Sequence, residues 1–455
     1  MGAPLLIPQG FRSHAERNLP RYTSYPTALA FNDGVGQGTA RDWAAQVGPG
    51  QAVSVYVHIP FCDQLCWYCG CHTTVPNGYR RISAYLERLH QEIDLWAGAL
   101  GPHGGAAHLH FGGGSPNALS PGDFFDLVQH LRDAFRVRPD AEVAVELDPR
   151  ALDDEFIAAI QRAAVTRASL GVQTFDPVVQ ARVNRIQPYA MIERAMTALR
   201  QAGVDGINFD LMYGLPAQGP DTVAASARLA AGLRPDRIAV FGYAHVPWFK
   251  KHQGVIREDE LADLDGRWAQ ADAADVVLAA EGYDLIGLDH YALPQDELTA
   301  AAREGRLRRN FQGYTVDPAE VLIPLGASAI GQFPQGFIQN ARATDAWAGA
   351  VADGRLAVDR GVTVTGEDRL RARVIERLMC DLGADIGDIC AAEGFCADHL
   401  DDGLSAASAL QPDGLCRVDG RRIAVPEDAR RLVRAVAACF DGALTASAAR
   451  HSKAL

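Results

Sequence analysis

Short apolar runs alternate with longer amphipathic stretches between about residue 50 and about residue 290. Runs rich in β-branched and aromatic residues, each ending in a Gly- or Pro-containing loop, lie at 52–60, 107–116, 141–149, 167–175, 206–216 and 237–247. Between them, stretches such as "ISAYLERLHQEIDLWAGAL" and "MIERAMTALRQAG" have helical spacing, and Gly203 closes the second as a C-cap. Regular alternation of strand and helix is typical of parallel βα units. The chain is therefore predicted to be α/β, with a partial (β/α)6-type parallel barrel.

The segments outside this repeat have different patterns. Residues 1–50 are predicted to form an N-terminal arm, whose "LPRYTSYPT" is too rich in Pro, Thr and Tyr for a regular helix. The barrel is assigned to 51–300, and 301–364 is expected to be a connecting segment that closes it. Residues 365–455 have mostly helical spacing, and "LQPDGLCRVDGRRIAVP" within them predicts a hairpin. We expect a mainly helical C-terminal domain with a small wing.

Composition and charge narrow the class of protein. The chain is 48% hydrophobic and 22% charged, which is typical of a globular protein. Its formal net charge of −13 disfavours non-specific binding to nucleic acid. No leader with a basic start and a long apolar run is seen, and no apolar run approaches the roughly 20 residues of a membrane span. We expect a cytoplasmic monomer that binds neither nucleic acid nor membrane.

Four of the nine cysteines lie together in "YVHIPFCDQLCWYCGCH" at 56–72, as Cys62, Cys66, Cys69 and Cys71. Thiols stay reduced in the cytosol, so such a cluster binds metal more often than it forms disulfides. Structural zinc usually takes two separated pairs of ligands, whereas tightly spaced thiolates are typical of iron–sulfur clusters. The spacing favours an iron–sulfur cluster held by three thiolates, with structural zinc as the alternative. The other five cysteines are expected in apolar cores.

Polar or Gly-rich signals follow each of the six predicted strands. After the cysteines come the glycines at 112–114, Glu146 and Asp148, Gln173, Asp210, and the run Tyr243, Ala244 and His245. In parallel α/β folds the carboxyl ends of the strands form the site of chemistry, so these residues are expected around one cavity. Glu146 and Asp210 lie within apolar strands, where an unpaired carboxylate is costly, so a ligand hydroxyl is an attractive partner and an arginine ion pair is the alternative. The glycines either bind a ligand or make a tight turn.

The spacing C-x3-C-x-aromatic-C, formed by Cys62, Cys66, Tyr68 and Cys69, resembles the signature of radical S-adenosylmethionine enzymes. More narrowly, "PRYTSYPT", "YGLP", "FGYAHVP", "RNFQGYT" and "CFD" resemble the oxygen-independent coproporphyrinogen III oxidases (dehydrogenases), from about residue 19 to about residue 445. The resemblance implies a 4Fe–4S cluster and two molecules of S-adenosylmethionine. It also implies oxidative decarboxylation of two propionates of coproporphyrinogen III, giving protoporphyrinogen IX in haem biosynthesis, with an unidentified reductant for the cluster.

The same resemblance assigns roles to individual residues. It implies cluster ligation by Cys62, Cys66 and Cys69, a place in the active site for Tyr56, His58 and Cys71, and cofactor contacts for Tyr56, Tyr68, Gly113, Gly114, Ser115, Glu146, Gln173, Arg185, Asp210, Ala244 and Ile330. Ser115 stands where the family commonly has Thr, and "IGQFPQGFIQN" at 330–340 is diverged. Alternatives remain: His58 as a satisfied core histidine, Arg185 as a solvated charge, and Ala244 and Ile330 as plain core.

A tetracarboxylate substrate on an acidic protein requires locally concentrated cations and hydroxyl donors. The candidates are Arg21, Tyr22, Thr23 and Tyr25 in the arm, and Arg309, Asn310, Gln312 and Tyr314 in "RRNFQGYT". Solvated loops are the alternative interpretation of both segments. A haem-carrying chaperone and a haem-degrading enzyme on the same scaffold are the other functional hypotheses; Cys71 and the long arm argue against the chaperone.

Overall fold

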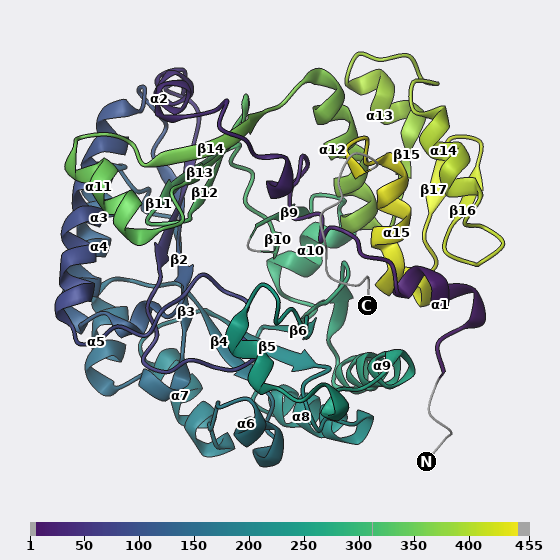
Figure 1. Cartoon of the computed structure of the whole chain (residues 1–455), viewed down its shortest axis with the longest axis horizontal. Helices are drawn as coiled ribbons and strands as arrows, with labels where there is room; N and C mark the ends of the chain where they lie inside the picture. Colours follow the sequence, from purple (N-terminus) through teal and green to yellow (C-terminus); the bar gives the residue numbers. More distant parts are fainter. Residues whose placement is uncertain (1–5, 312, 445–455) are drawn as a thin grey trace.

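A curved, mostly parallel sheet with helices on its outer face dominates the computed structural model, which describes residues 6–311 and 313–444 (Figure 1). Its twelve strands run in the order β14-β13-β12-β11-β1-β2-β3-β4-β5-β6-β8-β7. The six parallel strands predicted from the sequence are β1 (Val53–Ile59), β2 (Ala106–Gly113), β3 (Glu142–Leu147), β4 (Arg167–Gln173), β5 (Gly206–Tyr213) and β6 (Arg237–Gly242). The predicted partial (β/α)6-type barrel is therefore confirmed.

Helices follow these strands and cover the outer face of the sheet (Figure 1). They are α3 (Arg80–Ala99), α4 (Pro121–Ala134), α5 (Asp154–Arg162), α6 (Pro177–Arg182), α7 (Tyr189–Gln201) and α8 (Pro220–Gly232). Local chemistry sets where several of them begin: the side chains of Ser120, Asp153 and Asp176 accept hydrogen bonds from backbone amides of the first turn. Fully buried Phe111, Phe124 and other apolar side chains fill the layer between sheet and helices.

Further strands extend the sheet at both edges, and the two edges do not pair with each other. Beyond β1 lie the parallel β11 (Val321–Leu325) and the antiparallel β12 (Ile330–Phe333), β13 (Gly336–Asn340) and β14 (Val358–Thr363), with α11 (Thr344–Ala352). Beyond β6 lie β8 (His290–Ala292) and β7 (Asp284–Ile286), with α9 (Leu264–Ala280), α10 (Glu297–Arg303), β9 (Arg308–Asn310) and β10 (Gly313–Thr315).

The C-terminal region is mainly helical. It contains α12 (Gly366–Asp381), α13 (Ile386–Ala392), α14 (Asp401–Ser408) and α15 (Val433–Ala437), and a small sheet of β15 (Gly383–Asp385), β16 (Arg417–Asp419) and β17 (Arg422–Ala424). The hairpin β16–β17 is the predicted wing. Sequence patterns did not reveal the short strand β15, because three residues are too few to show alternation.

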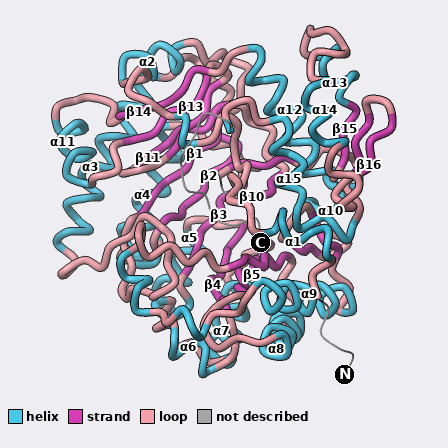
Figure 2. The backbone as a smooth tube through the Cα atoms, turned by 45° about the vertical axis from the view of Figure 1, so that its right-hand side comes forward, coloured by secondary structure: helices cyan, strands magenta, loops and turns pink. Residues whose placement is uncertain are grey.

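The beginning of the chain packs against this C-terminal region (Figures 1 and 2). After α1 (Gln9–Ala15), the side chains of Tyr22 and Tyr25 are buried in the same apolar core as α12 and α15. The hydroxyl of Tyr22 donates to Asp441 over 3.0 Å, and the Tyr25 hydroxyl accepts from the amide of Gly442 over 3.0 Å. Helix α2 (Gln37–Ala45) packs instead on the core of the barrel. The division of the chain at residues 50, 300 and 364 stays a prediction.

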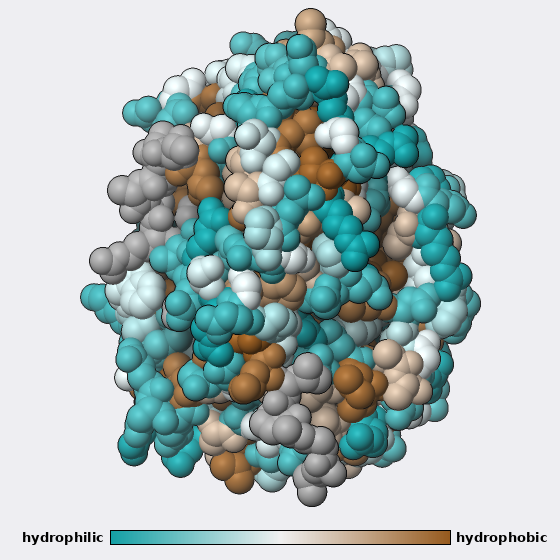
Figure 3. All heavy atoms as spheres, turned by 90° about the vertical axis from the view of Figure 1, so that its right-hand side faces the viewer, coloured by the Kyte–Doolittle hydropathy of each residue, from teal (hydrophilic) through white to brown (hydrophobic). Residues whose placement is uncertain are grey.

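The face of the molecule drawn in Figure 3 is predominantly hydrophilic. In Figure 3, which turns the right-hand side of Figure 1 toward the viewer, small apolar patches lie between larger hydrophilic areas. No helix within residues 6–311 and 313–444 combines the length and the apolar character needed to cross a membrane.

Candidate functional site

The four clustered cysteines lie in the loop that joins β1 to α3, at the carboxyl end of the sheet. Backbone hydrogen bonds hold this loop in place: the amide of Cys62 donates to the carbonyl of Thr74 over 3.1 Å, and the amide of Trp67 donates to Val183 over 3.0 Å. Cys62, Cys66, Cys69 and Cys71 all line one cavity of about 180 Å³. The loop therefore presents its thiols to the strand ends.

Most of the sequence-predicted site residues meet at this cavity. Its lining includes the four cysteines together with Tyr68, Gly113, Gly114, Glu146, Gln173, Arg185 and Asp210. Tyr56, His58 and Ser115 lie immediately behind it, through contacts described below. Ala244 lines a second, larger cavity, and Ile330 begins β12 and lines neither of these two cavities.

The glycines at the end of β2 allow three chain segments to approach closely. Gly113 has φ +111°, and a Cβ there would lie 2.5 Å from the ring of His58. A Cβ on Gly112 would lie 2.7 Å from Oε1 of Glu146, and one on Gly114 would lie 2.5 Å from the carbonyl oxygen of Phe61. Side chains at these positions would push apart β1, β3 and the cysteine loop. The glycines thus form a cradle that only residues without a Cβ can build.

Glu146 faces the cavity from β3 without an arginine partner in the described part of the chain. Its Oε1 lies 3.1 Å from Nε2 of His110, and its Oε2 accepts from the amide of Gly113 over 3.3 Å. Burial opposes its charged form, but the hydrogen bond and charge of His110 outweigh burial and lower the pKa of Glu146. Its side chain is 42% exposed, so an ionised carboxylate with room for further hydrogen bonds lines the cavity.

Asp210 faces the same cavity from β5. Its carboxylate accepts from Nδ2 of Asn208 over 2.8 Å and from the hydroxyl of Ser169 over 3.1 Å. Burial raises the pKa of Asp210 to about 6, and the negative charge of Glu146 adds to the shift. The alternative of an arginine ion pair, which the sequence left open for both carboxylates, is wrong: their partners are a histidine, an asparagine, a serine and a backbone amide.

His58 is a buried histidine with both ring nitrogens engaged. Its Nε2 lies 2.9 Å from the carbonyl oxygen of His72, which can only accept, so Nε2 carries the proton. Nδ1 therefore accepts from the hydroxyl of Tyr56, 3.1 Å away. Burial lowers the pKa of His58 to about 4, which keeps the ring neutral. The ring of Tyr56 stacks on His110, the partner of Glu146, with ring centroids 5.8 Å apart.

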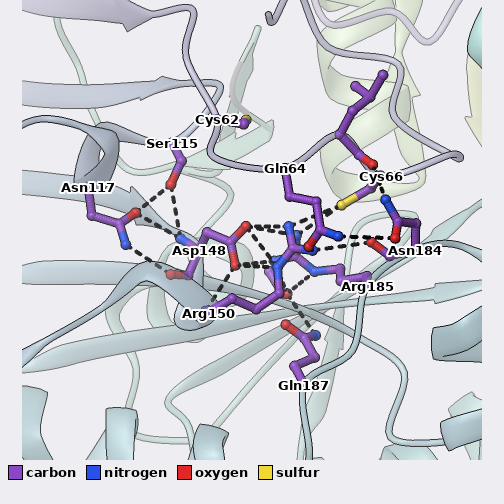
Figure 4. A network of polar contacts seen from close by, with 12 residues as sticks. Cys62, Gln64, Cys66, Ser115, Asn117, Asp148, Arg150, Asn184, Arg185 and Gln187 are labelled. Atoms are coloured by element: carbon purple, nitrogen blue, oxygen red, sulfur yellow. Dashed lines mark hydrogen bonds and ion pairs between the residues drawn. The ribbon is translucent and has the colours of Figure 1, made fainter. Parts of the chain in front are cut away.

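A network of two arginines and one aspartate surrounds Cys66 (Figure 4). Asp148 pairs with Nη2 of Arg150 at 2.6 Å and with Nη1 of Arg185 at 3.2 Å. The same two nitrogens donate toward Sγ of Cys66 over 3.3 and 3.4 Å. Arg185 is buried, so the alternative of a solvated surface charge is wrong for it. Two charged donors therefore point at the sulfur of Cys66.

Ser115 holds Asp148 of this network in position through hydrogen bonds. Its hydroxyl accepts from the amide of Asp148 over 3.2 Å and donates to Asn117, whose side-chain amide donates to the carbonyl of Asp148. Sequence analysis named Asp148 as a strand-end residue but gave neither it nor Arg150 a role. The signal was the Asp-Pro-Arg that follows β3, in which the aspartate caps a short helix and orients the arginine.

The donor set fits a cluster better than a single ion. Among residues 6–311 and 313–444, no three His, Cys, Asp or Glu side chains are grouped as ligands of one metal ion. A cubane cluster instead needs thiolates spread around a body several ångströms across. Cys62, Cys66 and Cys69 surround a cavity in this way. The exposed Cys71 hydrogen-bonds with Cys69, and this bond, against burial, lowers the pKa of Cys69 to about 6.

A second cavity of about 690 Å³ lies at the end of β6, between the barrel, the arm and the C-terminal region. Cationic side chains gather there: its lining includes Arg21, Arg267, Arg309, Arg431 and Arg434. Arg309 lies 4.4 Å over the ring of Tyr314, and its Nε and Nη1 are buried without a hydrogen-bond partner in the described part of the chain. Pockets for drug-sized ligands have volumes from about 300 Å³ upward, so this cavity has room for a larger ligand.

The candidate substrate contacts predicted from the sequence do not all lie at the large cavity. Arg21, Thr23 and Arg309 line the large cavity. Tyr22, Tyr25 and Tyr314 are buried and hydrogen-bonded within the fold, so the interpretation of both segments as solvated loops is wrong for these three tyrosines. Asn310 lines a neighbouring cavity of about 330 Å³, and Gln312 lies outside the described residues.

Comparisons with known proteins agree with this geometry. The family model of the radical SAM superfamily matches residues 56–230. The chain is 47% identical to an oxygen-independent coproporphyrinogen III oxidase of Bradyrhizobium diazoefficiens, over 97% of this chain and 98% of the relative. It is 42% identical to the protein of the same name from Paracoccus denitrificans, over 97% of each chain. The solved structure of coproporphyrinogen III oxidase from Escherichia coli, a radical SAM enzyme, superposes with a TM-score of 0.89 at 35% identity, covering 94% of this chain and 100% of that one.

Proposed function

Because the chain belongs to the oxygen-independent coproporphyrinogen III oxidase family of radical S-adenosylmethionine enzymes, we propose that it converts coproporphyrinogen III into protoporphyrinogen IX without oxygen. Two propionate side chains would each lose a β-hydrogen, an electron and CO2 to become vinyl groups. The observation that carries the proposal is the cavity at the strand ends, where thiols, glycine cradle and carboxylates converge beside a larger, arginine-lined cavity. We place the reaction in the cytoplasm and in a monomer.

The cysteine loop would hold a 4Fe–4S cluster through Cys62, Cys66 and Cys69. When bound, the cluster and S-adenosylmethionine supply a 5′-deoxyadenosyl radical that abstracts the propionate hydrogen. Arg150 and Arg185 direct charged donors at Sγ of Cys66 from 3.3 and 3.4 Å and would orient this ligand. The alternative of structural zinc has no group of three ligands among the described residues to support it.

The strand-end residues would orient the two cofactor molecules. Glu146 and Asp210 have carboxylate oxygens left over after their internal hydrogen bonds, so they can accept from ribose hydroxyls. Gly113 lets a ligand approach the backbone, and Tyr56 presents its ring beside His110. These residues, with Tyr68, are proposed to contact the first cofactor molecule.

Contacts with a second cofactor molecule are proposed for Gly114, Gln173 and Arg185, and an indirect role for Ser115. Gln173 has φ +65° at the end of β4, a conformation that is strained for a residue with a Cβ. That backbone strain at the cavity lining favours a functional place for Gln173. Because Ser115 is buried and engaged with Asn117 and Asp148, it would act by positioning the network that borders the cavity rather than by direct contact.

The large cavity would hold the porphyrinogen. Its arginines can pair with propionate carboxylates, and Arg309, with unpartnered buried nitrogens, is the best placed to gain a bond when a carboxylate arrives. Tyr243, Ala244 and His245 at the end of β6 line the same space. Tyr243 hydrogen-bonds to His245 over 2.8 Å, which fixes both rings at the cavity wall. Enclosure by the arm and the C-terminal helices excludes water from a reaction that produces radicals.

The test is anaerobic incubation of the iron-loaded protein with coproporphyrinogen III, S-adenosylmethionine and dithionite, with the tetrapyrrole product identified by mass spectrometry. Loss of two CO2 per molecule, with consumption of about two cofactor molecules, is the expected result. A matched incubation of Cys66→Ser should give no product. Recovery of unchanged porphyrinogen together with tight haem binding would favour a haem chaperone instead, and opening of a haem ring would favour a haem-degrading enzyme.

A further inference from the structure

The loop that follows β6 contains a rare kind of residue in this chain. The sequence has three lysines, Lys250, Lys251 and Lys453, so two of the three are adjacent in one surface loop. Arginine supplies nearly all other positive charge of a chain whose formal net charge is −13. Lysine is a flexible, strongly hydrated cation, whereas arginine suits fixed bidentate pairs. The ion pairs that stabilise the fold therefore do not account for this adjacent pair of lysines.

This loop is fastened directly to the cysteine loop by hydrogen bonds to three of its carbonyl oxygens. Nζ of Lys250 donates to the carbonyl of Cys71 over 2.8 Å, and Nε2 of His252 lies 2.8 Å from the carbonyl of Cys69. The side-chain amide of Gln253 donates to the carbonyl of Tyr68 over 2.9 Å. Any molecule seated on the lysine loop is thus within one or two residues of the backbone that carries the cluster ligands.

The surface at this point is positive and partly apolar. Cys71 and His72 are exposed, and Arg342, which follows β13, is exposed beside them. Partial burial lowers the pKa of His72, and the nearby charges of Lys250 and Arg342 lower it further. Phe249 next to Lys250 is 69% exposed, an unusual state for a large aromatic side chain. We define the basic rim as Cys71, His72, Phe249, Lys250, Lys251 and Arg342.

Nearby acidic residues do not neutralise the basic rim. Glu258, Asp259 and Glu260 follow in the next turn, and each faces a basic side chain of its own: His245, Arg257 and Arg182. Trp248 is also exposed, but it lines the large cavity, so it belongs to the proposed substrate site and not to the basic rim. The rim therefore combines positive charge, which can steer an acidic partner, with one exposed aromatic side chain that can anchor it.

We propose that the basic rim is the docking surface for an acidic, low-potential one-electron carrier protein, with flavin or iron–sulfur chemistry, that reduces the cluster. The proposal rests on the proposed function, which requires an external electron. In the step, one electron leaves the reduced carrier and enters the cluster, and no bond forms or breaks. Charge complementarity to Lys250, Lys251 and Arg342 steers an acidic carrier to a place where the cysteine loop reaches the surface, at the exposed Cys71 and His72.

The test compares two electron donors on the iron-loaded protein in anaerobic stopped flow. Reduced flavodoxin, a small acidic carrier, needs to dock, whereas dithionite is a small reductant that does not. In Lys251→Glu/Arg342→Glu, reduction by flavodoxin should slow about tenfold or more at low salt, and the difference should shrink as ionic strength rises. Reduction by dithionite should keep the wild-type rate. Neither substituted side chain has a hydrogen bond that holds the cysteine loop, which leaves Lys250 in place.

A matched control reverses the same number of charges elsewhere. Arg303 and Arg306 are exposed at the end of α10, near the amino end of the sheet, and Arg303→Glu/Arg306→Glu should leave both rates unchanged. Calorimetric titration of oxidised flavodoxin gives a second readout that is independent of turnover. It should show weaker binding to the rim variant, and Phe249→Ala should weaken binding several-fold with little salt dependence.

Three outcomes would overturn the proposal. One is equal flavodoxin-driven rates for wild type and the rim variant. Another is an equal loss with dithionite, which would mean that the residues act on the cluster and not on docking. The third is an equal loss in the Arg303→Glu/Arg306→Glu control, which would reflect net charge alone. Product formation with dithionite as sole reductant tests the proposed function separately, since it does not involve the basic rim.

Discussion

Two glutamates on one strand are used in opposite ways at the two ends of the barrel. Glu142 and Glu146 lie four residues apart on β3 and therefore on the same face of the sheet. At the amino end, Glu142 forms an ion pair with Arg167 at 2.8 Å, and Arg167 also reaches Glu297 at 2.8 Å. At the carboxyl end, Glu146 has a histidine and a backbone amide as partners.

The difference shows which end of the barrel is complete without a ligand. The amino end is closed by an ion-pair network that continues through Arg237, which binds Asp296 at 2.9 Å and Glu297 at 3.0 Å. At the carboxyl end, Glu146 and Asp210 are held by neutral donors and a histidine, which orient each carboxylate without using all of its acceptor positions. One end therefore contributes to stability, and the other keeps hydrogen-bonding capacity for cofactors.

The largest expected effect comes from a single thiol at the carboxyl end. Replacing Cys66 by Ser should abolish the cluster, because three thiolates are needed to hold it. Iron analysis and the visible absorbance of anaerobically purified protein measure this loss. Cys71→Ser is the matched control and should keep about four irons per chain. A variant Cys66→Ser that kept its full iron content would contradict the proposed ligand set.

The amino end should respond to Glu142→Ala through stability. Removing this carboxylate leaves Arg167 with one ion-pair partner, Glu297, in a mostly buried position. Breaking a fully buried pair costs roughly 3–5 kcal/mol, and the remaining partner reduces the expected loss in free energy of unfolding to about 2–3 kcal/mol. Urea denaturation measures it. S-adenosylmethionine binding by the folded variant should stay unchanged; a loss of binding would remove the contrast between the two ends.

The carboxyl end should show the reverse pattern in Glu146→Ala. Each hydrogen bond to a ligand hydroxyl is worth about 0.5–1.5 kcal/mol, so affinity for S-adenosylmethionine should fall several-fold. The absorbance of the cluster and the urea midpoint should change little. Equilibrium dialysis with the cofactor gives the affinity. If the variant bound cofactor normally but unfolded at markedly lower urea, Glu146 would be a structural residue like Glu142.

The smallest expected effect is a pH dependence that belongs to Asp210. The pKa of Asp210 is raised to about 6 by burial, so its proton stabilises the folded chain at low pH, and this contribution is lost as pH rises through about 6. The ionised carboxylate is the better acceptor, so cofactor affinity should rise through the same window. Asp210→Asn should flatten the stability profile between about pH 4 and pH 6 and the affinity profile around pH 6. Persistence of the affinity profile in this variant would assign the titration to another group.

Sequence patterns predicted the barrel and most of the cavity lining because both follow from short-range order. Apolar runs rich in β-branched residues predicted the strands, and residues at or just after their ends, such as Gln173 and Cys66, must meet at one edge of a parallel sheet. The side chains that contact those residues could not be predicted in the same way. Arg150 and Arg185 reach Cys66 across 84 and 119 residues of sequence, and no local pattern reports such a contact.

The same limit applied to the arm. Its Pro- and Tyr-rich segment was recognised as irregular, but Tyr22 bonds to a residue 419 positions away. From the sequence alone, these tyrosines were candidates for contact with the substrate. In the structure they are buried in a core to which residues near the end of the chain also belong. The carboxylate partners were also open until the fold placed His110 beside Glu146 on the neighbouring strand.

The pairing of the first residues with the last has a consequence for synthesis on the ribosome. The arm is made first, yet Tyr22 has no Asp441 to bind until 419 further residues have been added. At roughly 5–20 residues per second this delay is about 20–80 s. In the later part of that interval the cysteine loop and the strand ends have already been translated, while the wall that the arm and the last helices build around the large cavity is still incomplete. The nascent barrel thus passes through a stage in which its cysteine loop has been made before the large cavity has been enclosed.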